Sequence, residues 1–301
     1  MRLTSSLIAV ATVSLTLLSY NNNTEAYGAL AAGGLLSNVS TWADKVRPLS
    51  QYKWTSPLHF FNPPGDNPPE HCAAEYVYAG QDNVNALFNM TATLNRYQTN
   101  PPDTAEGKKI REEALKFFVH FMGDIHQPLH DSTPLRGGND APIKWGGRTN
   151  NLHSLWDTLM IVKDVNDRFD NNPQAYLDDT VNLAKTHWKD ASTWTFCDHE
   201  RNNATNPWSV DTNKIKTLCP IQWAVDANAL DCIYVWKEYS ATRDYSTDYF
   251  NQVTGSSSDF LVQRLLAISG VRMAAVLNEI YDPSAKAPLT KRGRARLPSK
   301  H

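Results

Sequence analysis

The histidines and aspartates of this chain repeat one spacing that suits metal ligation. His120 and Asp124 lie four residues apart, and His153 and Asp157 repeat the same interval. On a helix, residues four apart project from one face, so each pair can bind one ion without strain. Imidazole nitrogen and carboxylate oxygen are common zinc ligands. A single such pair is weak support for a metal, because the same spacing also favours a surface ion pair.

Three further residues of the same types strengthen the metal interpretation. His130 lies between the two pairs, and Asp44 and His59 precede them. Gly123 allows close approach of the backbone, and Pro128 is expected to end the helix near His130. The two repeated pairs, together with three further residues of the same types, therefore predict a metal centre rather than chance ion pairs.

The overall charge argues against a broad basic surface. The 301 residues include 29 Lys and Arg against 31 Asp and Glu, for a formal net charge of −2 at pH 7. Proteins that bind nucleic acid mainly through its phosphates carry a basic face, and this composition does not supply one. If the protein handles nucleic acid, it must use a local site, where metal cations can provide the positive charge.

The first residues have the features of a secretory signal peptide. Arg2 precedes an apolar run over residues 7–18, and Ala26-Tyr27-Gly28 has the small-x-small pattern of a cleavage site, so residues 1–28 form the predicted signal peptide. An N-terminal membrane anchor is the alternative, but the run is short for a bilayer. No other segment approaches the length of a membrane helix. We therefore expect a secreted, extracellular protein without a membrane anchor.

The cysteines and the glycosylation acceptors agree with a secretory route. Four cysteines in a secreted chain predict two disulfides with three possible connectivities, whereas a cysteine zinc site would need a Cys-x-x-Cys spacing that is absent. The cysteines are Cys72, Cys197, Cys219 and Cys232. Three Asn-x-Ser/Thr acceptors for glycosylation occur, at Asn38, Asn89 and Asn203.

The elements that must position these residues are mostly helices. Apolar periodicity predicts helices over 81–99, 105–122, 173–187, 221–239 and 260–280. Residues 61–70 and 131–151, rich in Pro, Gly and Asn, are predicted loops. Strand-like alternation is scarce, and no low-complexity linker divides the chain. We predict a mainly α protein of one domain, with a basic, disordered tail over 284–301 whose simplest interpretation is a solvated end rather than a binding arm.

Six sequence blocks match a known pattern. They are Trp42-Ala-Asp44-Lys-Val-Arg47, Pro57-Leu-His59-Phe-Phe-Asn62, residues 113–130, Arg136-Gly-Gly-Asn139, residues 151–157 and residues 219–232. Together they make the chain resemble the S1/P1 family of zinc-dependent nucleases, which is close in architecture to bacterial zinc-dependent phospholipase C. The resemblance covers about Trp42 to Tyr281. It implies that family's helical, single-domain fold over residues 29–283.

The resemblance also implies which residues hold which metal ion. A first zinc would be bound by Asp44, His59, His120 and Asp124. A second would be bound by His130, His153 and Asp157, which leaves open positions for water or substrate. His126 is not a ligand in the family pattern and is expected to support its neighbours or to pack. The implied disulfides are Cys72–Cys232 and Cys197–Cys219.

The family pattern contains a third zinc for which this sequence shows no complete ligand set. The resemblance assigns that ion to an N-terminal Trp, a His five residues later and the carboxylate that corresponds to Asp124. No Trp precedes Trp42, no His precedes His59, and too few residues separate Gly28 from Asp44 for the family's first helix and loop. We therefore expect two zinc sites and reduced phosphodiesterase activity.

The resemblance further implies the contacts to substrate. Arg47 would bind phosphate oxygens and offset charge in the transition state, Phe60 would stack on a base, and Asn139 would present its amide to the phosphate. Each has a simpler alternative: Arg47 as a surface residue, Phe60 as a core residue like Phe61, and Asn139 as a turn former. Asn62 stands where some members have an Asp implicated in base contact or water orientation, so base preference stays open.

The activity that the resemblance implies is hydrolysis of single-stranded DNA and RNA, and of 3′-nucleotides, to 5′-phosphorylated products. Two closely spaced zinc ions would lower the pKa of a bridging water for attack on phosphorus, and another would stabilise the leaving oxygen. A phospholipase C and a degenerate zinc-binding secreted protein are the alternatives. The blocks around Asp44, His59 and His153 favour the nuclease. No protein partner is implied, and we expect a monomer.

Overall fold

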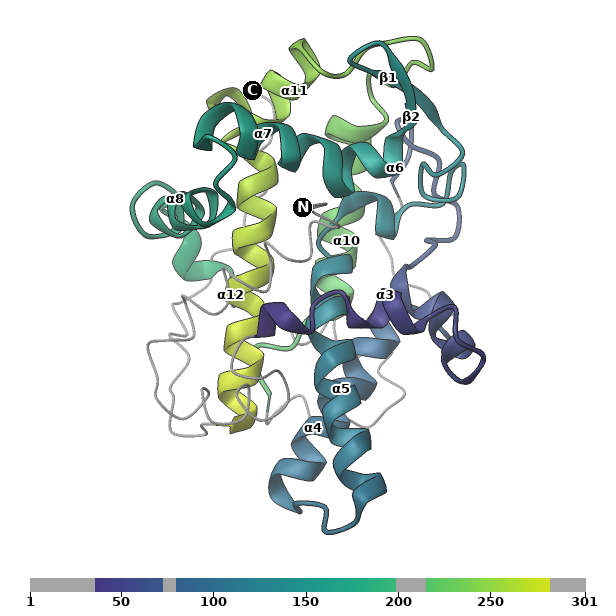
Figure 1. The fold of residues 1–301 in the computed structure, drawn as a ribbon, viewed down its shortest axis with the longest axis vertical. Coiled ribbons are helices and arrows are strands. Elements are labelled where there is room, and N and C mark those ends of the chain that lie inside the picture. Colours follow the sequence, from purple (N-terminus) through teal and green to yellow (C-terminus); the bar gives the residue numbers. More distant parts are fainter. Residues whose placement is uncertain (1–35, 73–79, 199–214, 282–301) are drawn as a thin grey trace.

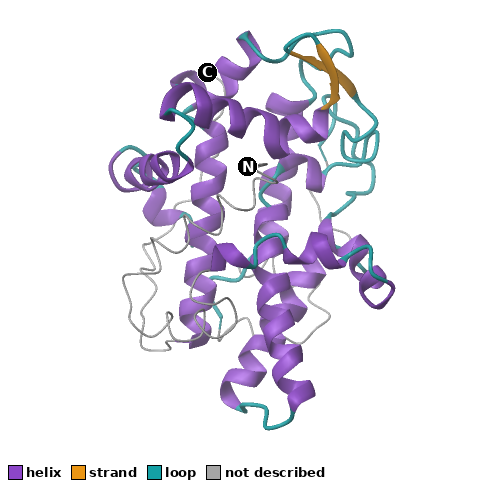
Figure 2. Ribbon diagram, viewed as in Figure 1, coloured by secondary structure: helices purple, strands orange, loops and turns teal. Residues whose placement is uncertain are grey.

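A computed structural model of the chain describes residues 36–72, 80–198 and 215–281 (Figure 1). Helices dominate this part, and its two short strands lie at one end of the helical body (Figure 2). The mainly α prediction is confirmed. The predicted signal peptide and basic tail lie outside the described residues.

In chain order, the elements are η1 (Leu36–Asn38), α3 (Trp42–Val46), η2 (Ser50–His59), α4 (Asn83–Thr99), α5 (Ala105–Asp124), η3 (Pro128–Asp131), β1 (Pro142–Trp145), β2 (Arg148–Asn151), α6 (Leu152–Ser154), η4 (Leu155–Leu159), α7 (Met160–Phe169), α8 (Pro173–Thr186), η5 (Ala191–Thr193), α10 (Pro220–Leu230), η6 (Asp231–Val235), α11 (Asp248–Thr254), η7 (Ser256–Ser258) and α12 (Leu261–Tyr281).

The long helices begin at capping residues. The side chains of Asp82 and Thr104 accept hydrogen bonds from backbone N–H groups three residues on, at the starts of α4 and α5. Asn172 caps α8, whose first residue is Pro173. Each cap satisfies a donor that the first helical turn leaves without a partner. Four predicted helices, over 81–99, 105–122, 173–187 and 260–280, are confirmed with small shifts of their ends.

The core lies between α5 and the C-terminal helix α12. Figure 1 shows α12 running along the body, where it packs against α5 and α4, and α5 also packs against α3. The Ser269 hydroxyl of α12 donates to the Met122 carbonyl of α5 at 2.7 Å. Phe88, Phe118 and Phe121 are almost fully buried between these helices. The last turn of α5 is therefore held on several sides, which matters because it carries two candidate metal ligands.

One expectation about membrane helices is wrong. By length and composition, α12 is long and apolar enough to cross a membrane, although the sequence suggested no such segment after the N-terminal run. In the structure, 83% of its apolar window is buried inside the protein. Its apolar residues therefore form core contacts with neighbouring helices, and they give no support for a membrane span.

The predicted loop over 131–151 contains a hairpin. Strands β1 and β2 pair antiparallel, with Pro142 opposite Asn151, and Gly146 and Gly147 form the turn with φ angles of +57° and +77°. Both glycines adopt the backbone region that other residues avoid. The strands could not be predicted from the sequence, because β2 is polar at every position and therefore shows no alternation of apolar and polar residues.

The hairpin turn is clamped by Asp244. Its carboxylate accepts hydrogen bonds from the backbone of Gly146 at 3.1 Å and of Gly147 at 2.7 Å. Hydrogen bonds from Ser246, together with those from the turn, lower the pKa of Asp244 to about 2. The carboxylate thus stays ionised at any physiological pH. The clamp orients β2, which ends at the cap of α6.

The predicted helix over 221–239 ends earlier. α10 stops at Leu230 and continues as a π-helical turn to Val235, where the Trp236 N–H bonds to the Asp231 carbonyl. This turn carries Cys232, which is joined to Cys72. The second disulfide links Cys197 to Cys219, so both pairings implied by the resemblance are confirmed.

Candidate active site

The last turn of α5 presents two candidate ligands side by side. His120 and Asp124 are 1% and 2% exposed. Their facing atoms, His120 Nε2 and Asp124 Oδ2, lie 3.2 Å apart. This is the shared face that the four-residue spacing predicts. The helix ends at Asp124 itself, and Pro128 begins the separate turn η3 that carries His130.

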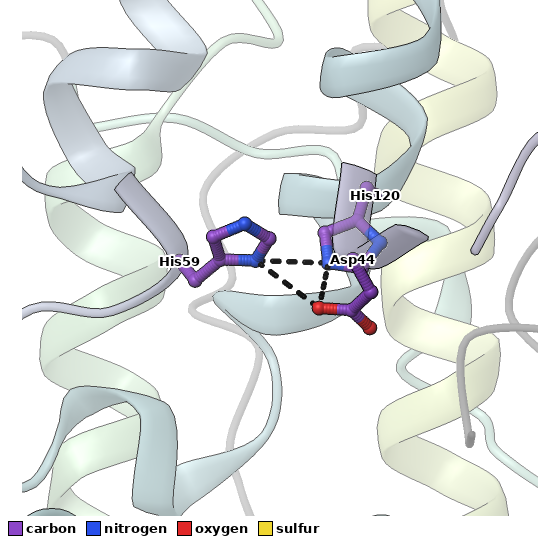
Figure 3. A group of neighbouring side chains, drawn as sticks. All are labelled: Asp44, His59 and His120. Atoms are coloured by element: carbon purple, nitrogen blue, oxygen red, sulfur yellow. Dashed lines mark hydrogen bonds and ion pairs between the residues drawn. The ribbon is translucent and has the colours of Figure 1, made fainter. Parts of the chain in front are cut away.

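A first cluster forms where α3 and the end of η2 meet α5. Figure 3 shows Asp44 and His59 pointing toward His120 from these two elements. His59 Nδ1 lies 3.0 Å from His120 Nε2. Asp44 Oδ1 lies 3.8 Å from the first nitrogen and 3.6 Å from the second. The three side chains thus direct one oxygen and two ring nitrogens at a common point.

A second cluster is built by η3, α6 and the π turn η4. His153 Nε2 lies 3.2 Å from Asp157 Oδ2, and His130 Nε2 lies 3.5 Å from Asp157 Oδ1. The two imidazole rings stack with their centroids 4.9 Å apart. The Asn151 side chain at the end of β2 accepts from the Ser154 N–H and starts the helix that carries His153. The wider π turn then places Asp157, a local irregularity often found at functional sites.

Asp124 lies between the two clusters. Its Oδ2 is 3.1 Å from His59 Nδ1 in the first cluster. Its Oδ1 is 3.5 Å from His130 Nδ1 in the second. One buried carboxylate therefore contacts both ligand sets, and it lies within reach of an ion in either.

Hydrogen bonds to backbone carbonyls fix the orientation of three histidines. The Nδ1–H groups of His120, His130 and His153 donate to the carbonyls of Ser40, His59 and Gly137 at 2.7, 2.8 and 2.7 Å. Because Nδ1 is the donor in each ring, Nε2 is the nitrogen that can give up its proton and bind a metal. Such outer contacts are typical of histidine ligands, because they fix the tautomer and raise the basicity of the other nitrogen.

The electrostatics of the site favour bound positive charge. Burial alone would raise the pKa of Asp124, but His120 and His130 hold it well below its ordinary value. Asp157 is likewise kept ionised by His130 and His153, despite its burial. In return, Asp124 and Asp157 raise the pKa of His130 to about 10 although burial lowers it. Without a metal the clusters hold protons, and a bound cation would displace them.

The residues fit zinc. The nitrogens His59 Nδ1 and His120 Nε2, 3.0 Å apart, direct lone pairs at each other unless a proton or a cation lies between them. Each cluster combines imidazole nitrogen with carboxylate oxygen, a ligand set common for zinc and unlike the all-oxygen sets of Ca²⁺ or Mg²⁺. The first set has four protein ligands with Asp124, and the second has three, which leaves room for water or substrate.

Gln127 supports the second cluster, a role that its sequence position does not predict. The Gln127 side-chain amide donates to Asp157 Oδ1 at 2.7 Å, and its oxygen accepts from the Leu129 N–H at 2.6 Å. It therefore caps the turn of His130 and orients the carboxylate of the second cluster. Its position directly before Pro128 is a signal for a capping residue, but nothing in the sequence indicates the contact with Asp157.

Gly137 is required by the same cluster. Its φ is +59°, and a Cβ at this position would lie 2.4 Å from the Leu129 carbonyl oxygen. Its own carbonyl accepts from His153. The Gly-Gly step of the Arg136-to-Asn139 block therefore has a positional reason: only glycine allows the loop to reach the histidine.

A cavity of about 690 Å³ opens over both clusters. The predicted substrate residues Arg47, Phe60, Asn62 and Asn139 all line it. On another side its wall is apolar, formed by Trp156, Ile161, Val262, Leu265 and Leu266. The metal ligands, a cation, an exposed ring and an apolar wall thus face one space, which suits a phosphate ester with a flat or apolar substituent.

The structure shows the surroundings of three of these residues. Phe60 is 39% exposed at the cavity, whereas Phe61 is 1% exposed in the core. Arg47 Nη1 lies 3.9 Å from Asp44 Oδ1, and the Arg47 side chain is 45% exposed. Asn139 uses its side-chain amide to bond the Arg136 carbonyl at 2.9 Å, the turn-forming role, while still lining the cavity.

His126 lies apart from both ligand clusters. Its Nδ1–H donates to the Met122 carbonyl at 2.8 Å, and its Nε2 accepts from Arg272 at 3.0 Å. Burial, together with the Arg272 charge, lowers its pKa well below the ordinary value. The neutral ring packs on Trp223. It therefore supports the end of α5, as the resemblance implies.

Comparison with known proteins agrees with this geometry. A family model described as S1/P1 nuclease matches residues 8–282. The chain belongs to the S1/P1 nuclease family. Among its relatives, Endonuclease 2 of Arabidopsis thaliana is 32% identical over 83% of this chain and 80% of its own length. Nuclease P1 of Penicillium citrinum is 30% identical over 83% and 86%, and Nuclease S1 of Aspergillus oryzae is 31% identical over 81% and 79%. Family membership makes this S1/P1 protein a hydrolase of phosphodiester bonds.

Proposed function

We propose that this S1/P1-family protein is a secreted, zinc-dependent enzyme. It hydrolyses single-stranded DNA and RNA, and 3′-nucleotides, to 5′-phosphorylated products. The observation that carries the proposal is the position of Asp124, which joins two histidine–carboxylate clusters at the base of a cavity. The names of its relatives, Nuclease P1 and Nuclease S1, support a nucleic-acid substrate.

The proposed mechanism divides the work between metal and protein. Bound zinc ions would supply Lewis acidity and an activated water. Asp124 and Asp157 keep the histidines oriented, and the carbonyls of Ser40, His59 and Gly137 fix their tautomers. Arg47 lies beside Asp44 at the cavity rim, where its guanidinium can bind phosphate oxygens as charge develops. Phe60 offers a flat apolar surface that tolerates any base.

The test measures product and metal dependence together. Purified protein should release acid-soluble, 5′-phosphorylated nucleotides from single-stranded DNA, lose this activity with EDTA and regain it with zinc. Release of phosphocholine from phosphatidylcholine without nucleotide release would instead support a phospholipase C. Absence of turnover in zinc-loaded protein would identify a degenerate metal-binding protein. The relatives reported above are all named as nucleases, which favours the first outcome.

Loss of the Arg47 guanidinium should slow turnover. We expect Arg47→Ala to lower kcat about 100-fold with a small change in KM, because the charge acts mainly in the transition state. Arg47→Lys should recover part of the loss, since it keeps the charge but not the bidentate geometry. The matched control is Arg148→Ala, an exposed arginine of β2 that does not line the cavity. Equal kcat for Arg47→Ala and the control would remove Arg47 from the mechanism.

Loss of the Phe60 ring should weaken binding of substrate. Base stacking contributes about 1–3 kcal/mol, so Phe60→Ala is expected to raise KM about tenfold or more with kcat little changed. Trp54→Ala is a suitable control, because Trp54 is 53% exposed but does not line the cavity. Steady-state kinetics on single-stranded DNA would distinguish the two. An unchanged KM in Phe60→Ala would assign the ring to another role.

Secretion and a monomeric state belong to the same proposal. The two disulfides are typical of an oxidising compartment. Of the glycosylation acceptors, Asn38 is exposed and Asn89 is half-buried within α4, while Asn203 lies outside the described residues. Glycan occupancy is therefore expected first at Asn38. Mass spectrometry of secreted protein, with size-exclusion chromatography for the monomer, would test these points.

A further inference from the structure

A second group of polar side chains lies directly behind the turn that carries His130. Asp131 ends η3 and is 0% exposed. Around it are Asn83 at the start of α4, Asn228 on α10 and Asp231 at the start of η6, all 1% exposed or less. Three stretches distant in sequence thus bring two carboxyl groups and two side-chain amides into the interior, since α10 continues directly into η6.

Hydrogen bonds connect the members of this group. The Asn83 amide donates to Asp131 Oδ1 at 3.3 Å. The Asn228 amide donates to the Asp131 carbonyl at 2.8 Å. Asn228 and Asp231 are three residues apart on one continuous helical stretch, so they share a face. Asp231 also interacts with Ser132, which directly follows Asp131.

Five oxygen atoms of these four residues have no donor in hydrogen-bond geometry, because the contact of Ser132 with Asp231 falls short of it. They are Asn83 Oδ1, Asp131 Oδ2, Asn228 Oδ1, and Asp231 Oδ1 and Oδ2. Buried polar atoms are nearly always satisfied, so five orphan oxygens in one hydrogen-bonded group call for an explanation. All five are acceptors. Only protons, ordered water or a cation can satisfy such a set.

The only positive charge that acts on Asp131 within the described parts of the chain is that of the neighbouring His130, which a bound zinc would remove. Neither Asp131 nor Asp231 forms an ion pair there. Asp66 adds further negative charge nearby, but its own oxygens are occupied: Oδ1 accepts from Asn228 at 3.1 Å and Oδ2 from the Thr133 N–H at 2.9 Å. Burial raises the pKa of the Asp231 carboxyl, and Asp66 and Asp131 raise it further. The two buried carboxyl groups therefore each require a proton or a share of a bound cation.

We propose that Asp131, Asp231, Asn83 and Asn228 bind a hard divalent cation of the calcium class. The two carboxylates would neutralise its charge, and the two amide oxygens would complete five ligand positions. Ca²⁺ accepts six to eight oxygen ligands in flexible geometry, whereas Mg²⁺ keeps several waters and needs a strict octahedron. Zinc prefers the nitrogen-containing clusters described above. The site is thus chemically distinct from the active-site metals.

Such a cation would stabilise the backbone of the active site on the side that faces away from the cavity. It would connect η3 to α4 and to the α10–η6 stretch, next to the Cys72–Cys232 disulfide. Because His130 immediately precedes Asp131, the cation would hold the backbone of a zinc ligand in place. The site contributes no group to the cavity, so its role is structural support rather than contact with substrate.

The test uses the full secreted chain saturated with zinc, so that the histidine clusters do not bind the added ion. After prolonged dialysis with or without Ca²⁺, metal analysis should find about one calcium per chain, and Tm should rise by about 5 °C at a concentration well above Kd. Tb³⁺ should luminesce through Trp236, whose indole N–H bonds Ser132 Oγ at 3.1 Å, and Ca²⁺ should quench the signal. This readout needs no variant. Absence of calcium uptake, Tm shift and Tb³⁺ signal would overturn the proposal.

The matched variants are Asp231→Asn in the group and Asp248→Asn, an exposed residue at the start of α11. Asp231→Asn should lose calcium uptake or weaken it at least tenfold, whereas Asp248→Asn should bind as the parent does. Asparagine has the shape of a protonated aspartic acid. If the parent takes up no calcium and Asp231→Asn is as stable as the parent, shared protons rather than a cation satisfy the five oxygens. Unchanged uptake in Asp231→Asn would place calcium elsewhere and also overturn the assignment.

Discussion

Replacing Asp124 by Asn should lower nuclease activity about a thousandfold while the protein remains folded. Such a loss corresponds to about 4 kcal/mol of transition-state stabilisation. The substitution keeps the side-chain shape but removes the charge that His59, His120 and His130 share. An amide N–H would also face a ring nitrogen or a metal ion. Because Asp124 contacts both clusters, we expect the zinc content to fall along with kcat.

The matched control for this change is Asp167→Asn. Asp167 is also in an i, i+4 pair on a helix, with Lys163 at 2.5 Å, but its side chain is 47% exposed and remote from the ligand clusters. It should retain parental activity and zinc content. If Asp124→Asn keeps two zinc ions and loses less than tenfold in kcat, the carboxylate does not serve both sites. Circular dichroism and Tm would confirm that both variants are folded.

The two candidate His–Asp ligand pairs could be predicted from sequence because their geometry is local. His120 with Asp124, and His153 with Asp157, are placed by helical spacing alone, and the structure brings Asp44, His59 and His130 to them. The long helices were equally accessible, since their apolar faces repeat over many turns. In each case a few neighbouring residues determine the position of a side chain.

Features that depend on distant contacts could not be predicted in this way. The polar strand β2 exists because it pairs with β1 and because Asp244, about a hundred residues later, clamps the turn. Phe60 and Phe61 have the same side chain, and only the tertiary structure exposes one and buries the other. The contact of Gln127 with Asp157 and the convergence of Asp131 with Asp231 are likewise products of packing.

Removal of zinc should lower Tm by about 15 °C. A ligand that binds only the folded state stabilises it in proportion to the logarithm of its excess over Kd, and two such sites add. The effect is large here because the stripped clusters leave His59 and His120 nitrogens facing each other at 3.0 Å beside two carboxylates. Calorimetry before and after chelation would measure the shift. Zinc alone should restore Tm, since it matches the nitrogen-containing clusters, whereas Mg²⁺ should not.

The zinc content of the purified protein should be two per chain. The first cluster with Asp124, and the second cluster by itself, each supply a protein ligand set. The third set of the family pattern needs a Trp and a His upstream, and this sequence has neither before Trp42 and His59. Without a third ion, Asp124 would serve the first zinc alone, and the attacking water would lose one Lewis acid. A content of three would show that the chain supplies other ligands beside Asp124, and the expected reduction in activity would no longer follow. An unchanged Tm on chelation would contradict the metal assignment itself.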